Sequence, residues 1–161
     1  MSDACQDACH FDTLTLTREI GCPPDRLFAL MTDRAARAIW SAPSEDVQIE
    51  IDECDIREGG REVARCGPRE TPEFQVVSTF HRVAPPAQLI LTETLSVGGD
   101  LLSVSLVSQE VQATGTGSLL KVTLQIVSVS GAETLDGYGE GWNGALDSLA
   151  KMARAGVEQV Q

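Results

Sequence analysis

Between Leu135 and Ala153 the chain reads LDGYGEGWNGALDSLAKMA, and the spacing of its apolar residues is the strongest indication of the fold. Its large apolar residues recur every three or four positions, which is the spacing of one face of an α-helix. Those residues are Leu135, Tyr138, Trp142, Leu146, Leu149 and Met152 or Ala153, with Glu140, Asn143, Asp147 and Lys151 largely opposite. Four glycines between residues 137 and 144 weaken an isolated helix, so this one needs a partner surface.

The segments before this helix alternate apolar and polar residues with period two, which predicts strands. We expect a first strand at 13–20, two short helices from Leu27 to Ala38, and then a run of strands. The run is expected near 47–51, 61–66, 73–83, 88–95, 101–113 and 119–129. Hairpin-connected strands form an antiparallel sheet, and one helix cannot cover a broad twisted sheet completely. The sequence therefore predicts an α+β fold in which a curved sheet of about six or seven strands wraps the C-terminal helix, leaving a cavity.

The 161 residues suit one domain, expected over 12–156, with short tails at 1–11 and 157–161. The formal net charge is -12 and no basic run occurs, so nucleic acid and anionic membrane surfaces are poor partners. No stretch approaches the length of a membrane span, and residues 1–10 lack the apolar segment of a secretory signal. We therefore expect a cytoplasmic protein.

The five cysteines are irregularly spaced, and in a reducing compartment they are expected to be free thiols. Cys5, Cys9 and His10 could be taken for metal ligands, but their spacing fits no zinc pattern well and a frayed tail is the simpler interpretation. We predict no metal and no cofactor. Cys54 and Cys66 flank a hairpin and are expected to face each other across it.

Four short motifs resemble a known family. They are DIREGGR at 55–61, FHRVAPP at 80–86 followed by LILT at 89–92, GWNGALDSL at 141–149, and WSAP at 40–43. In this order they resemble bacterial single-domain homologues of the C-terminal domain of eukaryotic heat-shock chaperone ATPase activators. That family lies in the SRPBCC superfamily with START domains, birch-pollen-allergen-like proteins and polyketide cyclases. Ser41, Ser78 and Arg82 depart from the family's usual pattern.

The resemblance implies a helix-grip fold and, in the leading interpretation, a non-enzymatic module that binds a small hydrophobic ligand. The ligand would be a lipid, sterol, polyketide or aromatic metabolite. Two alternatives stay open: an enzyme of the polyketide cyclase or dehydratase kind that uses the same cavity, and a chaperone ATPase-activating cofactor. The open edges of the sheet could also support a homodimer.

Aromatic and aliphatic side chains on the inner faces are the expected ligand contacts. Trp142 could form a pocket wall or pin the helix to the sheet as a core residue, and Trp40 is a candidate for the pocket rim. The complete predicted set is Trp40, Phe28, Phe74, Val76, Phe80, Leu91, Trp142 and Leu146.

Two polar residues are weak catalytic candidates. Glu93 shares parity with Leu89 and Leu91, so it could point into an apolar interior, where a carboxyl has a raised pKa. His81 could serve as a general base near neutral pH, although a histidine held by one hydrogen bond is the simpler interpretation. Asp55 and Arg57 are expected to brace a tight turn instead of forming a catalytic pair.

Overall fold

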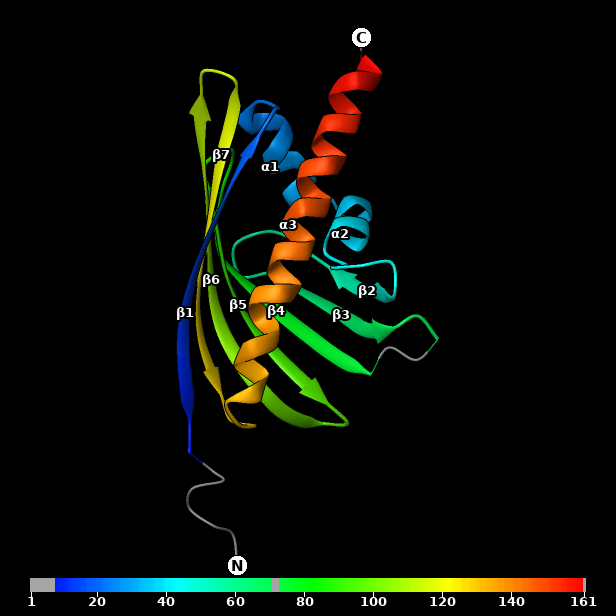
Figure 1. Ribbon diagram of the computed structural model, residues 1–161, viewed down its shortest axis with the longest axis vertical. Coiled ribbons are helices and arrows are strands. Elements are labelled where there is room, and N and C mark those ends of the chain that lie inside the picture. Colours follow the sequence, from blue (N-terminus) through cyan, green and yellow to red (C-terminus); the bar gives the residue numbers. More distant parts are fainter. Residues whose placement is uncertain (1–7, 71–72, 161) are drawn as a thin grey trace, which may run out of the picture.

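The computed structural model describes residues 8–70 and 73–160, and Figure 1 shows a curved sheet with one long helix crossing it. The elements in chain order are β1 (His10–Ile20), α1 (Pro24–Thr32), α2 (Arg34–Trp40), β2 (Val47–Cys54), β3 (Arg61–Pro68), β4 (Phe74–Ala84), β5 (Gln88–Val97), β6 (Asp100–Thr114), β7 (Gly117–Ser128) and α3 (Glu133–Val160).

All seven strands belong to one antiparallel sheet in the order β1-β7-β6-β5-β4-β3-β2. Strands β2 to β7 follow one another as hairpins, and β1 returns to pair with the last strand, β7. The predicted α+β class, the antiparallel sheet, the two short helices and the long C-terminal helix are all confirmed.

The ends of the domain differ from the sequence-based bounds. Strand β1 begins at His10, so His10 and Phe11 belong to the sheet and not to the expected tail; His10 pairs with Ser128. Strands pair through backbone hydrogen bonds, so the polar side chains that indicated a tail do not prevent residues 10 and 11 from joining the sheet. Helix α3 continues to Val160, beyond the last residue of the apolar stripe, because no proline interrupts 154–160. Cys5 lies outside the described residues.

The hairpin between β2 and β3 is tied to β4 by backbone hydrogen bonds. Gly59 N–H donates to the Phe80 carbonyl at 2.8 Å, and Phe80 N–H donates to the Gly60 carbonyl at 3.0 Å. Gly59 has φ 84°, and a Cβ on Gly60 would lie 2.1 Å from the Asp55 carbonyl oxygen. Asp55 and Arg57 form an exposed ion pair at 2.8 Å on this turn.

The prediction that Cys54 and Cys66 face each other is wrong. Cys54 pairs with Glu62 beside the turn, whereas Cys66 lies four residues further along β3 and pairs with Ile49.

The two halves of α3 are buried to different extents. Ala145, Leu146, Leu149 and Ala153 are buried in the core, whereas Leu135, Tyr138 and Trp142 in the first half are only half-buried. The helix packs mainly against β1, β7, α1 and α2, so it covers one side of the sheet more closely than the other.

Two glycines of α3 make a matched test of this packing. A Cβ on Gly144 would lie 2.5 Å from the Pro43 carbonyl oxygen, whereas one on Gly137 would meet no described atom within 4 Å. We therefore expect Gly137→Ala to raise the free energy of unfolding by about 0.5–1 kcal/mol through helix propensity. Gly144→Ala should lower it, because Pro43 must move. Urea denaturation measures both, and equal effects of the two substitutions would contradict the close approach of α3 to Pro43.

Candidate functional site: a cavity under the first half of helix α3

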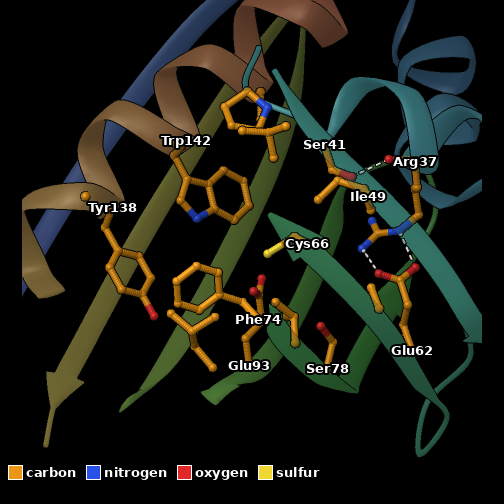
Figure 2. A pocket seen from close by; sticks show the side chains of 18 of the residues that line it. Arg37, Ser41, Ile49, Glu62, Cys66, Phe74, Ser78, Glu93, Tyr138 and Trp142 are labelled. Atoms are coloured by element: carbon orange, nitrogen blue, oxygen red, sulfur yellow. Dashed lines mark hydrogen bonds and ion pairs between the residues drawn. The ribbon is translucent and has the colours of Figure 1, made fainter. Parts of the chain in front are cut away.

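A cavity of about 350 Å³ lies between the inner face of the sheet and the first half of α3. Strands β2 to β6 form its floor, α3 forms its roof, and α2 with the segment that follows it closes one end. Gly137 and Gly141 line the cavity on the helix side, where larger residues would occupy the space. Figure 2 shows Trp142 and Tyr138 of α3 facing Phe74 and Glu93 of the sheet.

The walls are mainly apolar, and the structure brings five of the predicted contact residues together there. They are Trp40, Phe74, Val76, Leu91 and Trp142. Trp40 is a fixed wall because it is only 2% exposed and its indole Nε1–H donates to the Leu30 carbonyl at 2.9 Å. Trp142 both packs against the core cluster and lines the cavity, so its two alternative roles coexist.

Phe28, Phe80 and Leu146 lie outside this cavity. All three are buried in the core cluster. Leu146 is on the half of α3 that packs closely, and Phe80 lies further along β4 than Phe74 and Val76, on the same face of that strand. A shared face therefore does not ensure a shared cavity, because the helix covers only part of that face closely.

Glu93 is on the inner face of β5, as its parity with Leu91 indicates, and it lines the cavity. Its cross-strand neighbours are Ser78 on β4 and Ser105 on β6. Burial raises the pKa of the Glu93 carboxyl from its ordinary 4.5 to about 7; Arg37 lowers it and Glu62 raises it further. A carboxyl with this pKa can donate or accept a proton near neutral pH.

His81 is exposed and lies away from the cavity. Its Nε2 makes a 2.8 Å hydrogen bond with the Thr92 hydroxyl. Phe80 points into the core, and the next residue along the strand faces outward. The structure therefore does not bring His81 and Glu93 together.

A buried ion pair at one end of the cavity was not predicted from the sequence. The Arg37 guanidinium donates to both carboxylate oxygens of Glu62, at 2.7 and 2.9 Å (Figure 2). It also donates to the Met31 carbonyl at 2.7 Å. It also lies over the rings of Trp40 and Phe80. Glu62 shares parity with Ala64 and Cys66 on β3, which is the signal that could have placed it inside.

Other polar groups lie on the β6 side of the cavity. Tyr138 Oη and Ser103 Oγ are 2.5 Å apart, and burial raises the pKa of the Tyr138 phenol. Gln109 lines the cavity, and its Oε1 is buried with no hydrogen-bond partner among the described residues. Within 8–70 and 73–160, no three His, Cys, Asp or Glu side chains gather as metal ligands would.

The sequence model of one protein family, "Activator of Hsp90 ATPase homolog 1-like protein", matches residues 21–154. The chain belongs to this family. The match spans all elements from α1 to most of α3, so the resemblance inferred from the four motifs is confirmed. No curated protein matches the chain significantly.

Solved structures with similar folds include several bacterial proteins of the same architecture. An uncharacterised protein from Rhizobium leguminosarum has a TM-score of 0.82 at 21% identity, covering 92% of this chain and 97% of its own. A Rhizobium loti protein has a TM-score of 0.79 at 28% identity, with coverage of 89% and 98%. An AHSA1-like protein from Aeromonas hydrophila has a TM-score of 0.69 at 19% identity, with coverage of 90% and 94%.

Two of the three positions at which this AHSA1-family chain departs from the usual motifs line the cavity. They are Ser41, whose hydroxyl donates to the Arg37 carbonyl, and Ser78, which is 2% exposed. Arg82 is exposed and donates to the Gln88 side chain at 2.7 Å. Among the residues that the structure describes, no helix is long and apolar enough to cross a membrane.

The raised pKa of Glu93 predicts a pH-dependent stability. Native Glu93 keeps a proton that the unfolded chain releases, so the free energy of unfolding falls as pH rises from about 4.5 to about 7, by up to about 3 kcal/mol. Glu93→Gln has a neutral side chain at every pH, so its free energy of unfolding should rise relative to that of the wild type as the pH increases across this window. Urea unfolding at about pH 5 and pH 8 measures the difference, with Glu110→Gln, an exposed site on β6, as the control. The same wild-type-to-variant difference in the free energy of unfolding at both pH values would contradict the position of Glu93 in the cavity wall.

Proposed function

We propose that this AHSA1-family chain binds a small, mainly apolar molecule in the cavity under the first half of α3. The observation that carries the proposal is a hollow of about 350 Å³ walled by Trp142, Phe74 and Val76. Such a volume is within the range of small-molecule pockets, and apolar walls with a few polar groups are their usual composition. Lipids, sterols, polyketides and aromatic metabolites all have suitable apolar bodies.

The position of the cavity also supports binding. Its floor is a hydrogen-bonded sheet, which is rigid, whereas its roof is the glycine-rich half of α3. A preformed floor lowers the ordering cost of binding, and Trp142 and Tyr138 on the roof offer aromatic surface to a ligand. Most of the affinity would come from burial of apolar ligand surface.

A second candidate is an enzyme of the polyketide cyclase or dehydratase kind. Glu93 favours it, because a cavity carboxyl whose pKa is about 7 is suited to general acid–base catalysis. Turnover that Glu93→Gln abolishes while ligand binding persists would establish catalysis. Turnover that persists in Glu93→Gln would show that Glu93 is not a catalytic residue. Activation of a chaperone ATPase, after which the family is named, stays a prediction for this chain, as does the homodimer.

A cavity-filling substitution tests the binding proposal. Val76 lines the cavity, whereas Val77, the next residue of β4, points to the other face of the sheet. We expect Val76→Trp to weaken binding of the neutral fluorescent probe N-phenylnaphthylamine at least about tenfold, because the indole occupies the ligand volume. Val77→Trp should bind the probe like the wild type. The readout is the saturable rise in probe fluorescence.

Thermal unfolding of both variants shows whether each is folded. Equal probe binding by two folded variants would contradict the proposed site, and so would a wild type that binds no probe.

A further inference from the structure

Glu93 and Gln109 offer hydrogen-bond acceptors among the residues that line the cavity, and the cation that lines it, Arg37, is paired with Glu62. We infer that the ligand's polar end is a hydrogen-bond donor that is neutral or cationic, such as an alcohol, phenol, amide or amine, and not a carboxylate. This inference deepens the proposed function and rests on it.

Glu93 is the first observation behind it. Its carboxyl lines the middle of the cavity floor, between Ser78 and Ser105 on the neighbouring strands. When ionised, the carboxylate only accepts hydrogen bonds, and its charge repels an anion in a poorly solvated site. When protonated, it can still accept through its carbonyl oxygen. In both states a donor on the ligand is a suitable partner.

Arg37 is the cation that could have received an acidic ligand, but it is already engaged. Three of its N–H groups donate to Glu62 and to the Met31 carbonyl, and its charge is balanced by Glu62 in a bidentate pair. The pair is buried, with both side chains 8% exposed, so separating it to bind a carboxylate would leave Glu62 uncompensated. With Glu93 ionised, the three groups together carry one negative charge.

An unpaired acceptor on β6 points to the same ligand chemistry. Gln109 Oε1 can only accept, and it is buried with no partner among the described residues. Gln109 lines the cavity, and Ser105 is directly opposite Glu93 in the ladder. A buried polar atom left unpaired costs free energy, which a donor on the ligand would recover. Sterols, phenols and amines fit this requirement, whereas free fatty acids do not.

The charge preference should depend on pH through Glu93. The titratable groups that face it are Arg37 on α2, Glu62 and Cys66 on β3, and Tyr138 on α3, with Ser78 and Ser105 on the flanking strands. Burial raises the pKa values of Cys66 and Tyr138, so both stay neutral below about pH 8. Glu93 is therefore the group whose charge changes between about pH 6 and pH 8.

A matched ligand series tests the inference: naphthaleneethanol, naphthaleneethylamine and naphthaleneacetate share one apolar body. At about pH 8, calorimetric titration should give dissociation constants at least about tenfold lower for the alcohol and the amine than for the carboxylate. At about pH 6 the difference in affinity between the alcohol and the carboxylate should be smaller than at about pH 8, since Glu93 is then mostly protonated. Glu93→Gln should reduce the difference in affinity between the carboxylate and the other two compounds and abolish the pH dependence of that difference. Glu110→Gln should show the same difference and the same pH dependence as the wild type.

The failures of the two proposals are distinguishable. If naphthaleneacetate binds as tightly as the alcohol at about pH 8 and Val76→Trp blocks it, the cavity is a ligand site but the inference about the polar end is wrong. Unchanged discrimination in Glu93→Gln would also overturn it. If none of the three compounds binds while N-phenylnaphthylamine binds and Val76→Trp blocks it, the proposed function stands and this inference fails. If the wild type binds neither the three compounds nor the probe, both fail.

Discussion

The structure depends on one geometric constraint: a single helix must bury its apolar stripe against a curved sheet of seven strands. The second half of α3 meets this constraint with Leu146, Leu149 and Ala153, which are completely buried. In the first half, Tyr138 and Trp142 on the same stripe are only half-buried, and the space between Trp142 and the strands stays open. The cavity is thus a consequence of how far along the helix close packing extends.

The ion pair between Arg37 and Glu62 has two consequences at once. It joins α2 to the inner face of β3, which fixes the closed end of the cavity beside Trp40. It also neutralises the cation in the cavity, so the charge there is set by Glu93. A buried pair of this kind gives little net stability compared with an apolar replacement. Its value to the molecule therefore lies in the charge balance and shape of the site.

The sequence predicts the fold and part of the site. The change of period from two to 3.6 identifies the sheet and α3, and parity along β5 places Glu93 inside. Parity cannot say which inner-facing residues meet the cavity, so Phe80 and Leu146 were assigned to it although they lie in the closed core. The contact of Arg37 with Glu62 joins residues 25 apart on different elements, and no local pattern encodes it. Cys54 and Cys66 do not face each other because Cys54 lies beside the turn and Cys66 lies four residues beyond its partner, Glu62.

A crystal structure of the chain with naphthaleneethanol would show whether the cavity under α3 holds a ligand. We expect the naphthyl group between Trp142 and Phe74, with the hydroxyl within hydrogen-bond distance of Glu93 or Gln109. We also expect the pair between Arg37 and Glu62 to stay intact. A structure in which the cavity has closed on its own side chains, with the compound bound elsewhere, would contradict the proposed site.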